Sequence, residues 1–365
     1  MEFLETELKG RVIHDFPYPL KNRKCPHASL ISLTNPGGCV YRCPMCYARA
    51  YSWSIPDKII IYKNLVGKLL KEIEQLKIAF PFYLSQITDP LQPVKEVRVL
   101  TGQIIKILIA KKLSFKIVTK SADGVEELVK ENKELLKYPY WFLEMTVEAP
   151  PEKQIITSPQ ASPIKERIAI IKKLTEKGVE VIARTDPTIL GLIDKEDLEW
   201  LVDKLKIAGV KHIIASCGYY NKISMENIIK QMKNSIFKER IKRVMDYYQY
   251  HPNSEKKKFL APLKIRIEFH ANFKKLCEKN SLTYAVCQEL PKEYDSPDLP
   301  SCEGSKRNFV HIKIGKEFIP INCFGDCLRS CPNLKNPPCK MPIFQKEYPY
   351  KLKRIFANYL TMSLF

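Results

Sequence analysis

The stretch Asn35–Trp53, NPGGCVYRCPMCYARAYSW, holds three cysteines within eight residues, Cys39, Cys43 and Cys46, in a C-x3-C-x2-C pattern. A structural zinc site and a [4Fe-4S] cluster both usually take four protein ligands. Three thiolates leave one position on the metal open, as catalytic zinc sites do. Gly37 and Gly38 favour a tight turn whose N–H groups can face the sulfur atoms of such a centre. The stretch therefore predicts a metal centre that binds a further molecule.

Short apolar segments alternate with amphipathic segments along the next part of the chain. The pattern predicts strands over 27–35, 78–90, 114–121, 140–149, 179–187 and 210–218, and helices over 97–113, 124–138, 162–178 and 194–209. The third of these helices begins with Ser and Pro and ends with Gly, which are common start and stop signals. Repeated β-α units predict parallel strands with right-handed crossovers, in an open sheet or a partial barrel.

Polar residues follow most of the predicted strands. They are Thr88 and Asp89, Lys120 and Ser121, Thr146 and Glu148, Arg184 and Asp186, and Ser216 and Cys217. Ligands of such folds bind at the carboxyl ends of the strands. The three cysteines follow the first strand, so we expect them to lie at the same edge as these polar side chains.

The cysteine spacing, its place after the first strand and the six β-α units together resemble the radical S-adenosylmethionine (SAM) superfamily. Within it, four segments resemble the spore photoproduct lyase-related group, which is often labelled DNA repair photolyases: NPGGCVYRCPMCYAR (35–49), ITDPLQPVKE (87–96), IVTKS (117–121) and SPIKERIAIIKKLTEKGVEVIARTDPTILGL (162–192). The resemblance covers roughly residues 25–220. It implies a partial (β/α)6 TIM-like barrel, followed in this chain by a Cys-rich C-terminal appendage.

The resemblance also implies a chemistry. Cys39, Cys43 and Cys46 would hold a [4Fe-4S] cluster whose open iron chelates the amino and carboxylate groups of SAM. An electron from a flavodoxin- or ferredoxin-type donor would then cleave SAM to methionine and a 5′-deoxyadenosyl radical, which abstracts hydrogen from the substrate. The substrate itself is unknown.

Several further residues match positions of the family. Tyr47 matches an aromatic position of the lyases, and Asp89 and Lys120 match polar positions that line the SAM pocket, with Ser121 beside them. Lys120 is a candidate partner of the SAM carboxylate, because a cation pairs with it at short range. Arg184 is a second candidate. The alternative for both is an ordinary ion pair with Glu144, Glu148 or Asp186.

Two positions depart from the family pattern. Met45 stands where the family usually has an aromatic residue near the adenine, and a methionine still makes a soft apolar contact there. Gln86 stands where the lyase has its hydrogen-donating cysteine, which argues against reversal of the spore lesion itself. Cys217 is the candidate substitute donor. The alternative is that Cys217 is a small buried core residue, as a single cysteine commonly is.

A second group of cysteines follows residue 276. Its densest part, INCFGDCLRSCPNLKNPPC, places Cys323, Cys327, Cys331 and Cys339 in a C-x3-C-x3-C-x7-C pattern, with Cys287 or Cys302 as alternative ligands. Four thiolates can close a zinc site or bind a second [4Fe-4S] cluster. Free thiols are the remaining alternative.

The composition bounds the class of protein. The 365 residues carry a formal charge of +20, which fits either a nucleic-acid partner or a generally lysine-rich protein. Apolar runs long enough for a membrane span and a secretory leader are both missing from the sequence, so we expect a cytoplasmic protein. We expect an N-terminal extension (1–24), a radical SAM core (25–220), a basic helical region (221–278) and the Cys-rich appendage (279–365).

Two other functions fit the same residues. One is a non-catalytic nucleic-acid-binding protein stabilised by zinc, which leaves the three-ligand first site unexplained. The other is a radical SAM enzyme that acts on a protein or peptide.

Overall fold

The computed structural model describes residues 1–15, 25–251, 258–326, 329, 331–333 and 335–339. Its centre is an eight-stranded sheet with the strand order β14-β10-β9-β8-β7-β6-β3-β2. All neighbouring pairs are parallel except β2 and β3, which are antiparallel. The strands are β2 (Ile13–Asp15), β3 (Ser29–Ile31), β6 (Phe82–Leu84), β7 (Phe115–Thr119), β8 (Trp141–Thr146), β9 (Val181–Thr185), β10 (His212–Ala215) and β14 (Thr283–Val286).

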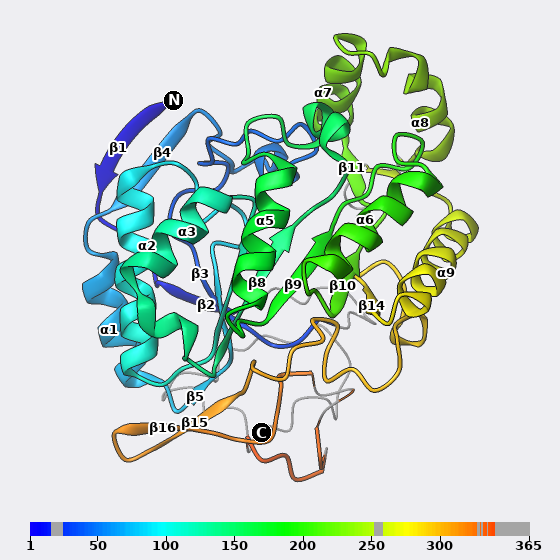
Figure 1. Cartoon of the computed structure of the whole chain (residues 1–365). Coiled ribbons are helices and arrows are strands. Elements are labelled where there is room, and N and C mark those ends of the chain that lie inside the picture. Colours follow the sequence, from blue (N-terminus) through cyan, green and yellow to red (C-terminus); the bar gives the residue numbers. More distant parts are fainter. Residues whose placement is uncertain (16–24, 252–257, 327–328, 330, 334, 340–365) are drawn as a thin grey trace.

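Helices cover one face of this sheet, as Figure 1 shows for α2, α3, α5 and α6. The helices are α1 (Leu65–Gln75), α2 (Lys95–Ala110), α3 (Ala122–Glu131), α4 (Gln154–Thr157), α5 (Ile164–Thr175), α6 (Lys195–Ile207), α7 (Lys222–Lys233), α8 (Ile241–Tyr247) and α9 (Leu263–Lys279). Short 3₁₀ turns lie at Ala48–Ala50, Lys133–Leu136, Pro151–Lys153, Lys238–Arg240 and Lys292–Tyr294.

Three small sheets surround the central one. They are the parallel pair β1 (Glu2–Thr6) and β4 (Lys58–Tyr62), the sheet of β11 (Tyr219–Asn221), β13 (Lys258–Leu260) and β12 (Gln249–His251), and the sheet of β16 (Glu317–Pro320), β15 (His311–Ile314) and β5 (Ile78–Ala79). In Figure 1 the β15–β16 hairpin lies at the opposite end of the molecule from α7 and α8.

The predicted β-α alternation is confirmed, and each of the ten predicted elements has a counterpart. The predicted strand over 78–90 is divided between two sheets: β5 joins the hairpin, and β6 enters the central sheet. Pro81 lies between them and donates no backbone hydrogen bond, so it interrupts the ladder. A further parallel strand, β14, extends the sheet beyond the six predicted strands. It lies inside the range 279–365, so part of the predicted appendage belongs to the central sheet.

The two faces of the sheet differ in what they bury. On the helix side, Ile213 and Ala215 belong to the large apolar core, whereas on the other side Phe142, Ile182 and Ile214 form a small separate cluster. Side chains alternate between the two faces along a strand, so these neighbours in sequence point in opposite directions. The α/β class is therefore confirmed. The sheet is open within the described residues, since β2 and β14 end it without pairing to each other.

The segment after β14 packs against the face that the helices leave uncovered. The Nε2 atom of His212 lies 3.1 Å from the main-chain oxygen of Cys302, and Lys116 pairs with Glu303. Both Lys116 and Glu303 are buried, so the ion pair compensates two charges that would be costly alone. Among the described helices, none is long and apolar enough to cross a membrane.

Candidate functional site

The loop that carries the three cysteines is held on one side by Asn35. Its Nδ2 donates to the main-chain oxygen of Ile55 at 2.9 Å, and its Oδ1 accepts from the main-chain N–H of Ile60 at 2.8 Å. Gly37 has a φ of +81°, and a Cβ there would lie 2.2 Å from the Ser54 hydroxyl oxygen. The glycine is therefore required by both the conformation and the space.

Gln92 holds the same loop from the other side. Its Nε2 donates to the main-chain oxygen of Gly38 at 3.1 Å, and its Oε1 accepts from the N–H of Val40 at 2.8 Å. Its side chain is fully buried. On α7, the Ser224 hydroxyl donates to the oxygen of Cys46 at 3.2 Å. The backbone on both sides of Cys39 is thus fixed before any ligand binds.

Cys39, Cys43 and Cys46 are all half-buried at the carboxyl edge of the sheet. Burial raises the pKa of Cys39, and nearby Asp89 and Cys43 raise it further, while N–H groups of Tyr41 and Asp89 point at its sulfur. Burial also raises the pKa of Cys43 to about 12, against the opposing effect of Lys120. The thiols are therefore neutral when nothing is bound, and as thiolates they would need a cation or cluster to compensate their charge.

The spacing of these sulfurs differs from that of a single-ion site. In the described part of the chain, three ligating atoms lie within 4.8 Å of one another at Cys217, His270 and Glu289, and the loop cysteines do not form such a group. A tetrahedral zinc ion with Zn–S bonds of about 2.3 Å would bring its sulfurs to about 3.8 Å apart. The three loop sulfurs are therefore not gathered as closely as the ligands of one zinc ion.

Asp89 follows β6 and holds the end of β7. Its carboxylate accepts from the N–H of Lys120 and the hydroxyl of Thr119, both at 2.7 Å, and from the N–H of Leu91 at 2.9 Å. Burial raises the pKa of Asp89, although these hydrogen bonds act in the opposite direction. Asp89 therefore fixes the backbone from which Lys120 projects.

Lys120 is half-buried next to Cys43 and Glu148. Its charge acts on both of these groups, yet it forms no ion pair within 4.0 Å with any acid in the described residues. Glu148 is instead paired with Arg167, whose Nη1 lies 2.9 Å from its Oε2. Although burial alone would raise it, Arg167 and Lys120 hold the pKa of Glu148 below its usual range. The Lys120 ammonium is thus available to an anionic ligand.

Arg184 is already paired. Its Nη1 donates to Glu144 at 2.6 Å, its Nη2 pairs with Asp186, and Nη2 also lies 3.3 Å from the Cys287 sulfur. Glu144 is fully buried between Arg184 and Lys116, whose Nζ lies 3.2 Å away. The ion pairs named above as the alternative for Arg184 are therefore present.

The remaining predicted residues have structural contacts of their own. Met45 is buried in the main core. The Ser121 hydroxyl accepts from the N–H of Gly124 at 3.1 Å and caps α3. Tyr47 is 40% exposed, and its hydroxyl donates to the oxygen of Gln86 at 2.9 Å. Each lies at the edge where the sequence predicts the cofactor, and Tyr47 alone of the three is exposed there.

Cys217 and Cys287 lie on opposite faces of the sheet. Cys217 is fully buried on the helix side, where its sulfur lies 3.6 Å from Nε2 of His270 on α9. Cys287 follows β14, packs against Phe142, Ile182 and Ile214, and faces Arg184. Of these two thiols, Cys287 shares the face of the polar residues at the sheet edge.

The cysteines that follow residue 276 include two groups whose members lie near one another. Burial raises the pKa of Cys323 to about 12, with smaller contributions from Cys339 and Cys331 nearby, whereas Cys327 lies outside the described residues. A hydrogen bond with Cys25 and then burial raise the pKa of Cys302, and Cys25 also acts on Cys287. The structure thus brings the two alternative ligands together with Cys25, a residue that the sequence pattern does not single out.

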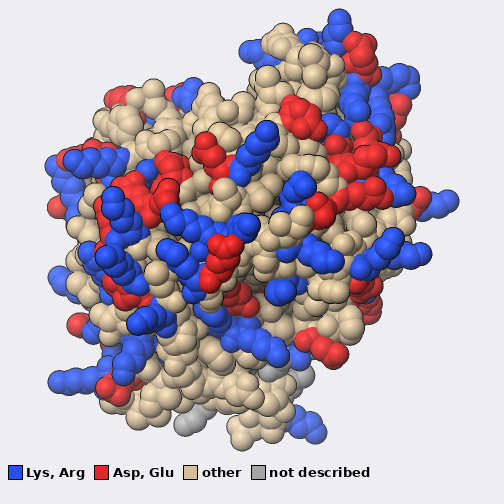
Figure 2. Space-filling view, in the orientation of Figure 1, with Lys and Arg blue, Asp and Glu red and all other residues tan. Residues whose placement is uncertain are grey.

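The charge is mixed on the face that carries α2, α3, α5 and α6. Figure 2 shows Lys and Arg side chains interspersed with Asp and Glu over these helices. This face therefore presents no continuous basic patch for a nucleic acid.

The sequence and the fold of this chain were compared with those of known proteins. No protein-family model matches the chain. A radical SAM Nalpha-GlyT isomerase of Pseudomonas phage M6 is 23% identical over 289 residues, which are 73% of this chain and 56% of that protein. This chain therefore matches little more than half the length of that relative. The chain is therefore similar in sequence to a radical SAM protein, and it carries its three closely spaced cysteines in the loop that follows the first parallel strand.

The fold of this chain resembles that of a solved structure. A mutant of spore photoproduct lyase with dinucleoside spore photoproduct has a TM-score of 0.56, at 14% identity over 78% of this chain and 81% of that chain. The fold of this chain is therefore similar to that of spore photoproduct lyase. Streptococcus suis SuiB bound to S-adenosylmethionine has a TM-score of 0.36, at 12% identity over 51% of this chain and 39% of that chain.

Proposed function

We propose that this protein is a radical SAM enzyme in which Cys39, Cys43 and Cys46 hold a [4Fe-4S] cluster on a partial (β/α) barrel. One observation carries the proposal: three half-buried thiols on a braced loop lie beside Lys120, whose ammonium has no ion pair in the described residues. The thiols suit a cluster with one open iron, and the ammonium suits the carboxylate of an amino acid bound there.

Residues of the chain would hold the cluster loop and the cofactor-binding lysine in place. Asn35 and Gln92 fix the loop, and Asp89 fixes the backbone of Lys120. When bound, the cluster and SAM supply reductive cleavage of SAM to methionine and a 5′-deoxyadenosyl radical. Lys120 would orient the carboxylate of SAM, and Cys287 would present a thiol on the face where a substrate binds. A flavodoxin- or ferredoxin-type protein would supply the electron.

A nucleoside-containing substrate is the class that we propose. The related lyase structure contains a dinucleoside, and that likeness supports the proposal for this chain. Beside the cysteine loop, Tyr51 and Trp53 are stacked with ring centroids 4.6 Å apart, and Trp53 is 56% exposed. Tyr47 meets Tyr51 edge to face at 5.8 Å. Exposed aromatic side chains of this kind stack on bases.

The test begins with protein purified and reconstituted without oxygen. We expect about four irons and four sulfides per chain, an electron paramagnetic resonance signal after dithionite reduction that changes when SAM is added, and formation of 5′-deoxyadenosine. A second cluster on the later cysteines would double the iron. Zinc in place of iron, with no effect of SAM, would instead support a zinc-stabilised binding protein and overturn the proposal.

Two variants make the test specific. Cys43→Ala should abolish both the SAM-dependent signal and 5′-deoxyadenosine. Cys277→Ser is the control, because Cys277 is a buried cysteine on α9 far from this loop in the sequence. The control should retain iron and product. Equal iron and equal product in both variants would exclude the loop as the cluster site.

A further inference from the structure

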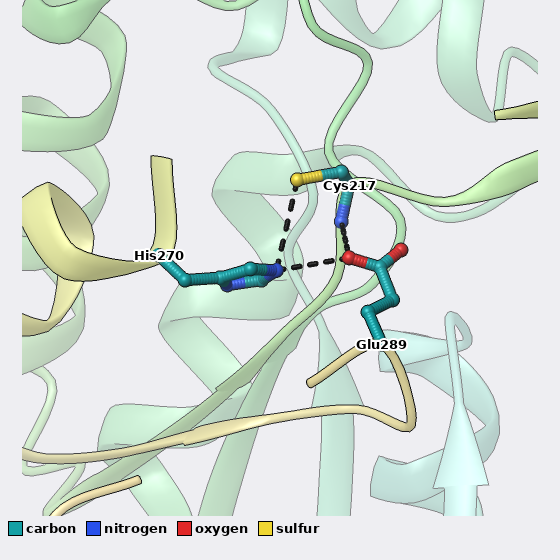
Figure 3. A group of neighbouring side chains, drawn as sticks. All are labelled: Cys217, His270 and Glu289. Carbon is teal, nitrogen blue, oxygen red and sulfur yellow. Dashed lines mark hydrogen bonds and ion pairs between the residues drawn. The ribbon is translucent and has the colours of Figure 1, made fainter. Parts of the chain in front are cut away.

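Cys217, His270 and Glu289 converge from three separate elements on the helix side of the sheet. Cys217 follows β10, His270 lies on α9, and Glu289 follows β14. Figure 3 shows the three side chains pointing toward one another. Gln288, between Cys287 and Glu289, has a φ of +63° and so lies in the left-handed region. None of these residues takes part in the proposed SAM chemistry.

The three ligating atoms lie close enough together to share a single metal ion. The sulfur of Cys217 lies 3.6 Å from Nε2 of His270, and that nitrogen lies 2.9 Å from Oε2 of Glu289. All three atoms lie within 4.8 Å of one another. A tetrahedral ion with Zn–S of about 2.3 Å and Zn–N of about 2.0 Å places its sulfur and nitrogen ligands about 3.6 Å apart.

The surroundings fit a metal ligand set as well. Nδ1 of His270 lies 2.6 Å from the hydroxyl of Tyr284, which is the outer contact that fixes the ring of a metal-bound histidine. Cys217 and His270 are both fully buried, and the Glu289 side chain is 5% exposed. The second carboxylate oxygen of Glu289, Oε1, is buried without a hydrogen-bond partner. A buried, incompletely satisfied carboxylate is costly, and metal coordination is one way to compensate it.

The charges around Glu289 also favour a bound cation. Within the described residues, His270 is the only basic side chain within 4.0 Å of the Glu289 carboxylate. Arg266 is close by, but its guanidinium donates to the main-chain oxygens of Ala261 and Glu289. The complex of a divalent cation with one thiolate and one carboxylate has no net charge. On binding, the thiol proton of Cys217 would leave to solvent, and the proton of neutral His270 would reside on Nδ1.

The same contacts argue against a nucleophilic cysteine. A histidine that activates a thiol must accept the thiol proton on the nitrogen that faces it. Here that nitrogen also faces the Glu289 carboxylate at 2.9 Å, which favours a proton already on Nε2. The Cys217 side chain also has no exposed surface through which a substrate could reach its sulfur. The group is therefore placed to bind an ion rather than to react with a substrate.

We propose that Cys217, His270 and Glu289 form a structural site for a zinc-class divalent cation that ties together β10, α9 and β14. Cysteine sulfur, imidazole nitrogen and carboxylate oxygen are all zinc ligands. A fourth position is open to water or to the second oxygen of Glu289. The site joins the last two strands of the sheet to the helix between them, so its contribution is to stability and is independent of SAM cleavage.

The experiment compares metal content in folded, full-length variants. His270→Gln keeps a hydrogen-bonding side chain but loses the imidazole ligand, and Cys217→Ser keeps the volume but loses the thiolate. Cys277→Ser is the matched control, a buried cysteine of the same helix outside the group. After exposure to Zn²⁺ and desalting, each of the first two variants should carry one zinc fewer per chain than the wild type and the control. Equal zinc in all four would overturn the proposal.

Crystals of the wild-type protein grown with ZnCl2 give a reading that does not depend on the variants folding. Anomalous scattering at the zinc edge should show a peak between the three side chains. Hydrogen-bonded Cys217, His270 and Glu289 with no peak between them would overturn the site. Because zinc is read directly, this outcome is distinct from any failure of SAM cleavage.

Discussion

Arg184 on β9 donates to Glu144 on β8 at 2.6 Å, so the arginine that sequence pattern offers as a SAM ligand is held by a buried carboxylate. Asp186 pairs with the same guanidinium. Lys120, at the end of β7 and two strands from Arg184, has no such ion pair in the described residues. The two cations at the sheet edge therefore differ in role: Arg184 holds strands together, and Lys120 is available to a ligand.

Lys120→Met should weaken SAM binding by about tenfold, which corresponds to about 1.4 kcal/mol. The reason is the loss of a charge-assisted contact with the SAM carboxylate. The dissociation constant would be measured by calorimetry on cluster-loaded protein without oxygen. Lys130→Met, an exposed lysine on α3, is the control and should bind SAM as the wild type does. Unchanged affinity in Lys120→Met would remove this residue from the cofactor site.

Glu144→Gln should lower the free energy of unfolding by about 1–3 kcal/mol, because Lys116 and Arg184 lose the carboxylate that they share while each keeps one other acidic partner. Burial alone would raise the pKa of Glu144, but Lys116 and Arg184 hold it below its usual range. Urea unfolding at pH 7.5 measures the change. Glu126→Gln removes an exposed pair with Lys173 and should leave the stability essentially unchanged. A similar small effect in both variants would contradict the prediction.

Gln92→Ala should accelerate loss of iron from the reconstituted protein several-fold. The substitution removes both hydrogen bonds that connect this side chain to Gly38 and Val40 around Cys39. Iron release to a chelator, followed by absorbance, gives the rate. Gln103→Ala, on the exposed side of α2, serves as the comparison and should retain iron at the wild-type rate.

Protonation of His212 should lower the free energy of unfolding as the pH falls. Burial lowers the pKa of His212 to about 4, although a hydrogen bond to Cys302 opposes this. The unfolded chain has a pKa of about 6.5 at this residue, so it binds the proton first as the pH falls. The contribution to stability is complete above about pH 6.5 and is lost as the pH falls toward 4, with about 2 kcal/mol lost at pH 5.

Urea unfolding at pH 7.5 and pH 5 would measure this effect. His212→Gln keeps a side-chain donor for Cys302 and should lose less stability between the two values than the wild type does. An identical pH dependence in the two proteins would show that His212 does not contribute.

Sequence pattern was sufficient for the features that arise locally. The strands and helices between residues 27 and 218 follow from alternating and helical periodicity, because each depends on neighbours within a few residues. The spacing of Cys39, Cys43 and Cys46 likewise indicates a metal loop without reference to the rest of the chain. The order of the polar residues along the chain predicted that they meet at one edge, since parallel strands end together.

Tertiary contacts decided which of those residues are available. Gln92 braces Gly38 across 54 residues, and Lys116 pairs with Glu303 across 187 residues. No local pattern specifies such pairs. The same holds for the thiols: alternation along β10 and β14 places Cys217 among the helices and Cys287 on the polar face, but only the pairing of the strands reveals that β14 belongs to the sheet. The sequence by itself therefore determined the spacing of the three thiols in the cysteine loop, because that spacing is local. The packing of distant segments determined that Lys120 lies near Cys43 and that Cys287 lies on the polar face of the sheet.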